Sequence, residues 1–316
     1  MTIPVGKDSL SMSTEWIKDK KNKSTISPLS LVVTGFSPIK DISIAVTPEL
    51  KDKESSLIFI DLGKGKQRMG GSIFSQTSNE NGEACPDVEC KDEMPLFVKA
   101  MSKLISLKKI LAYHDRSDGG LITTLAEMSF AGRLGLSIKL DHILIDQNKL
   151  TELLLNEELG VVIQVLSDEK ASVIDTLNES GLKDYIYDIG TISKKPQIDI
   201  IFDNQNLISL EIKDLLENWH RVGHEIQLLR DNPDTATSEF IHDTDFFSSG
   251  LKPEINFLVP KNINIGSNKP RIAILREQGV NGQNEMAAAF NEVGFDCIDV
   301  HLSLIHISEP TRLTCI

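Results

Sequence analysis

Blocks of hydrophobic positions separated by polar turns predict strands and helices in alternation along most of the chain. Apolar runs rich in branched residues predict extended segments at 26–39, 56–63, 109–115, 161–166 and 184–193. Helical spacing of apolar residues predicts helices at 95–107, 121–132, 150–160, 168–182 and 214–231. Two alternating segments, 197–202 and 207–212, are separated by DNQN and predict a β-hairpin. The pattern as a whole indicates an α/β or α+β layer fold, in which helices cover a mixed sheet.

The pattern changes after residue 231. Residues 232–270 are polar, interrupted by prolines and only weakly periodic, so they are predicted to be a linker with some extended contacts. A new βαβ unit follows, with RIAIL as a strand, an Ala-rich helix at 284–295 and CIDVH as a second strand. Because about thirty residues cannot bury one face of their own sheet, this unit is expected to be the truncated start of a doubly wound domain.

Composition and charge narrow the classes of function. The 316 residues are enough for about two domains, and the hydrophobic fraction of 40% allows a sizeable core. A formal net charge of −13 argues against a duplex nucleic-acid partner, although a small phosphorylated ligand stays compatible with it. There is no apolar run of membrane-spanning length and no apolar signal region, so no membrane partner or export is expected. Cys85 and Cys90 lack a second pair of ligands nearby and are interpreted as reduced thiols.

Candidate chemistry is concentrated in YHDRSDGG, where a predicted strand meets a predicted helix. The first amides of a helix are unpaired donors at the positive end of its dipole, so this position suits a phosphate. Asp115 beside a phosphate would call for a cation such as Mg²⁺, Ser117 could bond a phosphate oxygen, and Asp118 could cap the helix. The alternative is structural, because Asp and Ser are common helix caps and Gly-Gly is a common turn.

Two further loops carry glycine and basic residues. In IPVGKDSLSM, Lys7 and Ser9 could meet a phosphate, but the spacing is not that of a P-loop and a solvated loop is the preferred interpretation. In GKGKQRMGG, residues 63–71, a surface turn is preferred over a ligand site.

Six stretches in order resemble the phosphoribosylformylglycinamidine synthase family in its large, single-chain form. They are IPVGKDSLSM, IDLGKG, LAYHDRSDGGLITTLAEMSFAG, NEELGVVIQV, LRDNP and RIAILREQGVNGQNEMAAAFNEVGFD. Each is moderately specific, their order is very specific, and the resemblance covers almost the whole chain to His301.

The resemblance implies an ATP- and glutamine-dependent ligase of purine biosynthesis that converts formylglycinamide ribonucleotide to the amidine. It implies a cytoplasmic, monomeric full-length enzyme, with ATP and Mg²⁺ as cofactors and no nucleic-acid or membrane partner. Within YHDRSDGG it assigns Asp115 as a Mg²⁺ ligand and Ser117 as an ATP contact. It assigns no catalytic residue to this chain, since the other metal ligands are expected upstream and the glutaminase triad downstream. The alternative is a structural, non-catalytic nucleotide held in one half of a duplicated scaffold that is inactive alone.

The same resemblance divides the chain. Residues 1–47 are expected to be the tail of a synthetase-like N-terminal domain. Residues 48–230 are expected to form a C-terminal domain like that of aminoimidazole ribonucleotide synthetase. A linker at 231–270 is expected to precede the truncated start of a class I glutamine amidotransferase domain at 271–301. Residues 302–316 are similar to one reading frame of a transposon-type sequencing adapter and are expected to be a non-native tail.

Overall fold

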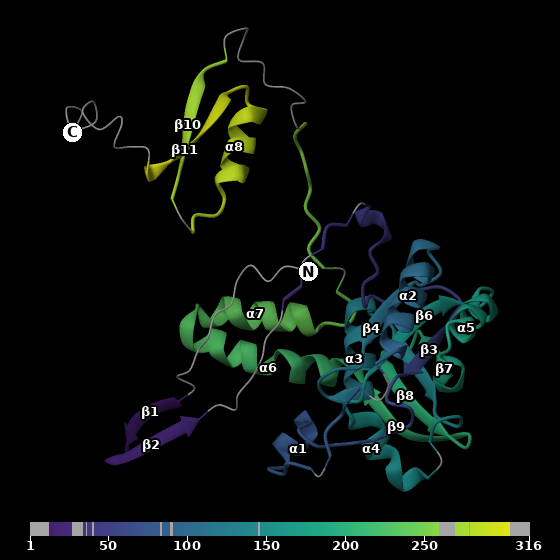
Figure 1. Cartoon of the computed structure of the whole chain (residues 1–316). Coiled ribbons are helices and arrows are strands. Elements are labelled where there is room, and N and C mark those ends of the chain that lie inside the picture. The colour runs from purple at the N-terminus through teal and green to yellow at the C-terminus, as the bar shows by residue number, and fades with distance from the viewer. Residues whose placement is uncertain are drawn as a thin grey trace. The chain divides into compact units, whose positions relative to one another are not determined.

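The computed structural model describes residues 13–26, 34–35, 37–39, 41–82, 84–88, 91–144, 146–248, 250–258, 269–277 and 279–303. The chain divides into two compact units, Met1–Ser248 and Ser249–Ile316 (Figure 1). The Lys7 and Ser9 loop, most of the predicted extended segment 26–39, Cys90 and residues 304–316 lie outside the described residues.

A seven-stranded mixed sheet forms the centre of the first unit, in the order β4-β6-β3-β7-β5-β8-β9. Its strands are β3 (Ser55–Asp61), β4 (Ala112–Asp115), β5 (Gly135–Lys139), β6 (Gly160–Leu166), β7 (Ile186–Ser193), β8 (Gln197–Phe202) and β9 (Gln205–Glu211). Neighbouring strands are antiparallel except β5 and β8, which are parallel. Every residue of β3 is buried, as the apolar run at 56–63 predicts.

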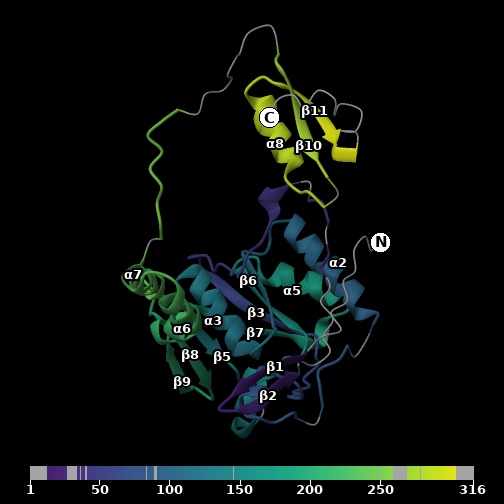
Figure 2. The ribbon, with the colours of Figure 1, turned by 90° about the vertical axis from the view of Figure 1, so that its left-hand side faces the viewer.

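Helices cover both faces of this sheet (Figure 2). Ile58 and Ile60 of β3 belong to a core shared with α2 (Glu93–Ser106) and α5 (Lys170–Glu179). Leu57 and Phe59 point to the opposite core, because side chains alternate along a strand. That second core includes residues of α3 (Gly120–Gly132), α4 (Leu150–Leu155) and α6 (Ile212–Arg230). The predicted α/β layer fold is therefore confirmed.

The remaining elements of the first unit are short. Helix α1 (Ile73–Thr77) and three 3-10 turns, Ile42–Ile44, Gln147–Lys149 and Lys183–Tyr185, lie in connecting segments. Strands β1 (Ser13–Lys18) and β2 (Lys21–Ile26) form an antiparallel hairpin that the hydrophobic pattern did not indicate, because all its residues are exposed. Among the described residues, no helix combines the length and apolar character needed to cross a membrane.

The predicted linker begins with a helix, and the expectation of extended structure is wrong there. Helix α7 (Pro233–Thr244) starts directly after Asn232, whose side chain accepts hydrogen bonds from the amides of Asp234 and Thr235. Asn at the cap and proline at the first helical position are a common start signal. The helix packs on α6, and Phe240 stacks on His224 with ring centroids 4.4 Å apart.

The second unit contains the predicted βαβ arrangement. Strands β10 (Arg271–Arg276) and β11 (Asp296–His301) pair in parallel, and α8 (Gln283–Glu292) connects them. Helix α8 contacts both strands.

Candidate functional site

The loop between β4 and α3 carries both residues that the sequence singles out. Asp115 ends β4, and Ser117 lies two positions later; both are exposed. Arg116 between them is only 4% exposed. Its backbone amide donates to Gly160 O at 2.7 Å, and the hydroxyl of Thr124 donates to Asp115 O at 3.0 Å. The loop is therefore anchored to β6 and α3 while Asp115 and Ser117 lie at the surface.

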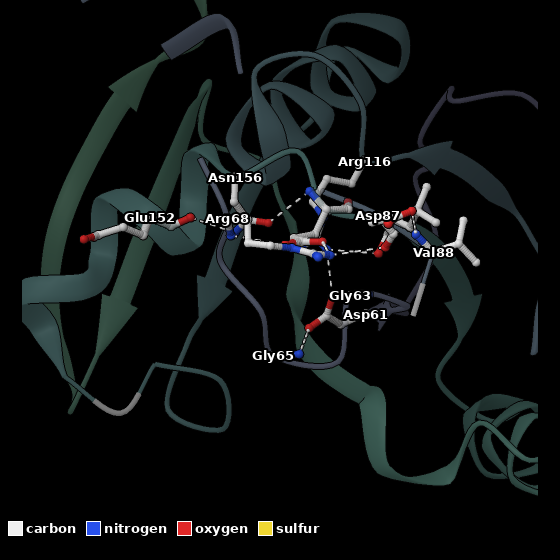
Figure 3. A network of polar contacts seen from close by, with 11 residues as sticks. Asp61, Gly63, Gly65, Arg68, Asp87, Val88, Arg116, Glu152 and Asn156 are labelled. Carbon is white, nitrogen blue, oxygen red and sulfur yellow. Dashed lines mark hydrogen bonds and ion pairs between the residues drawn. The ribbon is translucent and has the colours of Figure 1, made fainter. Parts of the chain in front are cut away.

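Arg116 anchors this loop through a buried ion pair (Figure 3). Its Nη2 donates to Asp61 Oδ1 at 2.7 Å and to Leu159 O at 3.0 Å, and its Nε donates to Glu158 O at 2.5 Å. The guanidinium carbon lies 4.9 Å from the centroid of the Phe59 ring. Burial lowers the pKa of Arg116 from its ordinary value, and the carboxylates of Asp61 and Glu158 oppose that shift. A guanidinium stays protonated in proteins, so the loop is held by a permanent charge.

The glycine-rich stretch 63–71 contains turns at its two ends, as expected, and it is also tied to the same buried network. Asp61, the last residue of β3, accepts hydrogen bonds from the amides of Gly63 at 3.1 Å and Gly65 at 2.7 Å. Arg68 reaches Glu158, which is fully buried, with Nε–Oε1 at 2.6 Å and Nη2–Oε2 at 2.7 Å. Two interior acids therefore hold this loop, Asp61 at Gly63 and Gly65 and Glu158 at Arg68.

A carboxylate already occupies the mouth of α3. Glu157 Oε1 accepts from the Gly119 amide at 2.8 Å and from the Ile73 amide, the first of α1, at 2.9 Å. The Gly120 amide donates to Ser117 O at 3.0 Å. The Gly119 and Gly120 amides therefore have acceptors within the protein, and the expectation that a phosphate binds at this helix end stays a prediction.

The glycine pair at this helix has a structural role. Gly119 and Gly120 have φ angles of 81° and 72°, which side chains rarely adopt. A Cβ on Gly120 would lie 2.7 Å from the carbonyl oxygens of Leu154 and Asn156. Gly119 is the helix cap and no side chain caps it, so the expectation that Asp118 caps α3 is wrong. The structural alternative thus accounts for the two glycines.

A cavity of about 260 Å³ lies beside the buried network. Its lining includes Asp61, Gly65, Arg116, Asn156 and Tyr187. Burial raises the pKa of Tyr187, and the charge of Asp61 adds to the shift. The neutral phenol of Tyr187 and the buried guanidinium group of Arg116 therefore line the same cavity.

Asp115 offers a carboxylate to a cation, but its neighbourhood does not complete a metal site. Within the described ranges, no cluster of three or more His, Cys, Asp or Glu residues is arranged to hold a metal ion. Burial, followed by the neighbouring carboxylate of Asp115, raises the pKa of Tyr113 on the same strand. A cation at Asp115 would therefore need other oxygen ligands besides such a cluster, such as water or nucleotide phosphates.

Sequence reasoning missed the four charged residues that build the network. Asp61, Arg116, Glu158 and Arg68 contact one another across long separations in the chain, which no local spacing reveals. A signal did exist: IDLGKG, HDRSDGG and NEELG each carry the family resemblance, and the structure brings these three stretches together.

Three family models match the chain in order. The FGAR-AT PurM_N-like domain matches residues 1–38, and the C-terminal domain of AIR synthase related proteins matches residues 57–203. The CobB/CobQ-like glutamine amidotransferase domain matches residues 269–313. This last match extends beyond residue 301, into the stretch expected to be a non-native tail.

Solved structures give distant likenesses. Thermotoga maritima PurL complexed with ATP is 10% identical, with 73% of this chain and 32% of that chain covered and a TM-score of 0.43. T. maritima PurL complexed with FGAR is also 10% identical, with coverages of 71% and 33% and a TM-score of 0.44. Hydrogenase maturation protein HypE is 16% identical, with coverages of 52% and 55% and a TM-score of 0.39.

The assignment to a family rests on the three family models and their order, since the structural likenesses are remote. The chain spans about a third of the length of the PurL chains that it matches. A synthetase-type N-terminal segment, a synthetase-type C-terminal domain and an amidotransferase segment follow one another along one polypeptide. The chain belongs to the phosphoribosylformylglycinamidine synthase (FGAR amidotransferase) family.

Proposed function

We propose that the chain is part of an ATP- and glutamine-dependent ligase that converts formylglycinamide ribonucleotide to formylglycinamidine ribonucleotide in the cytoplasm. The order of the three family models supports the reaction class, because it joins a synthetase to an amidotransferase. The observation that carries the site is the inward anchoring of Arg116, which leaves Asp115 and Ser117 exposed on either side of it.

The residues of the loop suit a magnesium–nucleotide complex. Asp115 offers an exposed carboxylate, the oxygen ligand that Mg²⁺ prefers. Bound there, Mg²⁺ would neutralise part of the charge of the nucleotide phosphates. Ser117 would donate its hydroxyl hydrogen to a phosphate oxygen. Arg116 keeps both residues in place through Asp61 and so lowers the entropic cost of binding.

In this proposal, ATP transfers its γ-phosphoryl group to the amide oxygen of the substrate and leaves as ADP, and ammonia released from glutamine then displaces that phosphate. The second unit contains the segment that matches the amidotransferase domain. We assign no catalytic residue to the described part of the chain. Asp115 and Ser117 are proposed to bind the nucleotide.

Nucleotide affinity tests the site, measured by calorimetry in the natural protein that contains these residues. Asp115→Asn should weaken Mg²⁺–ATP binding, because the site loses an anionic ligand. Ser117→Ala should weaken it roughly fivefold, the effect of one hydrogen bond of about 1 kcal/mol. Asp175→Asn removes the same charge from an exposed position of α5 and is the matched control. Equal affinities for Asp115→Asn and the parent protein would refute the assignment.

Steady-state turnover of the same variants separates a catalytic nucleotide from a structural one. With a catalytic nucleotide, turnover falls together with affinity in Asp115→Asn. With a structural nucleotide, intrinsic turnover changes little, while the gain in melting temperature on adding Mg²⁺–ATP becomes smaller.

A further inference from the structure

Glu157 occupies a position that normally attracts anionic ligands. The N-terminus of a helix binds anions through its free amides and its dipole. Here the half-buried carboxylate of Glu157 accepts from the Gly119 amide at the start of α3 and from the Ile73 amide at the start of α1. One side-chain oxygen, Oε1, receives both bonds.

A second amide at the mouth of α3 also has an acceptor within the protein. The Gly120 amide donates to the carbonyl oxygen of Ser117, and Leu121 is fully buried. A phosphate that binds the Gly119 amide would therefore have to displace the carboxylate of Glu157.

The charges around the mouth oppose an anion that arrives without a cation. Asp115, Asp118 and Glu157 each carry a carboxylate on this loop or against it. The two guanidinium groups of the network are bonded to acids of their own, Arg116 to Asp61 and Arg68 to Glu158. An approaching polyphosphate thus meets negative charge that a metal ion bound to it would offset.

We propose that Glu157 determines the metal dependence of the nucleotide site: its carboxylate keeps metal-free phosphates off the N-terminus of α3, so that ATP binds only together with its divalent cation. This inference rests on the proposed function of Asp115 and Ser117. Glu157 touches no ligand in this account and acts by occupying the amides and by its charge.

Glu157→Gln is the sharpest variant, because the amide side chain keeps an oxygen acceptor for both backbone amides and removes only the charge. Binding of ATP in EDTA should strengthen on the order of tenfold, as expected when one unit charge near the phosphates is removed. Binding of Mg²⁺–ATP should change less, so the affinity for Mg²⁺–ATP should exceed the affinity for metal-free ATP by a smaller factor than in the parent protein. These affinities are measured by calorimetry in the natural protein that contains these residues.

The matched control is Glu152→Gln, which removes the same charge from α4 in the neighbouring segment. It should leave the ratio of metal-free to Mg²⁺–ATP affinity unchanged. Equal ratios for the parent protein, Glu157→Gln and Glu152→Gln would overturn the inference. If, in the same experiment, Asp115→Asn still weakens Mg²⁺–ATP binding, the proposed site survives and only the role of Glu157 fails.

A second measurement needs no nucleotide. Glu157→Ala leaves the Gly119 and Ile73 amides without their carboxylate acceptor, so inorganic phosphate or sulfate should take its place. These ions should raise the melting temperature of the 316-residue Glu157→Ala chain more than that of the parent chain, by preferential binding to the folded state. Equal shifts for both chains, with chloride as the reference salt, would show that Glu157 does not keep anions from the helix, whatever the nucleotide does.

Discussion

At the scale of single residues, the most consequential side chain of the loop is one that points away from any ligand. Arg116 forms an ion pair with Asp61 and donates hydrogen bonds to the carbonyl oxygens of Glu158 and Leu159. Its guanidinium group also lies over the ring of Phe59. A buried ion pair of this kind adds little net stability over an apolar pair, but removing one partner leaves a charge without compensation. The position of Asp115 and Ser117 therefore depends on a buried residue between them.

Arg116→Met tests this dependence. The free energy of unfolding of the first unit should fall by about 3–5 kcal/mol, because Asp61 stays buried without its cation. Urea denaturation followed by circular dichroism measures the change. Arg221→Met removes the same group from an exposed position of α6 and should have little effect. A loss below about 1 kcal/mol for Arg116→Met would show that Asp61 is not dependent on Arg116.

At the scale of elements, the edge of the sheet is held by a polar cluster on β8 and β9. Asp199 accepts from Ser209 Oγ at 2.6 Å, from Gln197 Nε2 at 2.8 Å and from Asn206 Nδ2 at 3.2 Å. The hydrogen bond from Ser209 is the main reason why the pKa of Asp199 lies below its ordinary value of 3.8; partial burial opposes the shift.

Acid stability should therefore depend on Ser209. Because folding lowers the pKa of Asp199, the ionised carboxylate stabilises the fold above pH 3.8, and this contribution is lost as the pH falls through the folded-state pKa. In Ser209→Ala the pKa of Asp199 in the folded state should rise, so the loss of stability in acid that is due to Asp199 should become smaller and should be complete at a higher pH. Carbon-13 NMR titration of the Asp199 carboxyl measures the shift, with Ser238→Ala on α7 as the control. An unchanged titration curve would refute this role for Ser209.

The elements that could be predicted from the sequence are those with a clear apolar period. The run at 56–63 and the spacing in 95–107 correspond to β3 and α2. Strand β5 was missed because GLSIK is short and begins with a glycine, which does not favour a strand. The structure explains this glycine, because a Cβ at Gly135 would lie 1.8 Å from the carbonyl oxygen of Lys195. Helix α7 was missed because its sequence is mostly polar and has only a weak apolar period. Its packing on α6 stabilises the helix, and this contact cannot be read from the local sequence.

Only the exposed residues of the candidate site could be predicted from the sequence. Asp115 and Ser117 stand out as a local motif, and their role as ligands stays a prediction. The network beneath them depends on contacts between residues such as Arg116 and Asp61, which only the strand order brings together. The role of Glu157 could not be predicted for the same reason, since no residue near it in the sequence indicates that its carboxylate lies at the N-terminus of α3.

At the scale of the whole molecule, the boundary between the two units lies after α7 and not at its start. Residues 233–244 are helical, whereas the described residues 250–258 form neither helix nor strand and are exposed. The interpretation of 232–270 as one linker therefore has to be divided at this point.

A protease specific for glutamate can distinguish the two parts. Glu239 lies on α7 and Glu254 lies in the irregular segment, and both side chains are exposed. Cleavage after Glu254 should precede cleavage after Glu239, because a protease needs an extended backbone and α7 would first have to open. Mass spectrometry of a time course identifies the first products. Faster cleavage after Glu239 would contradict the helical assignment of the former linker.

The place of β3 in the sheet has a consequence for synthesis on the ribosome. Both neighbours of this wholly buried strand are encoded much later, since Ile58 pairs with Ile163 of β6 and with Asp188 of β7. While the chain emerges from the N-terminal end, SLIFI has no partner strand until β6 leaves the ribosome. Exposed apolar strands of this kind aggregate readily, and domains are completed only when their last contacts are available. Nascent chains that stop before β6 should therefore bind chaperones strongly at β3, and chains that extend beyond β7 should release them.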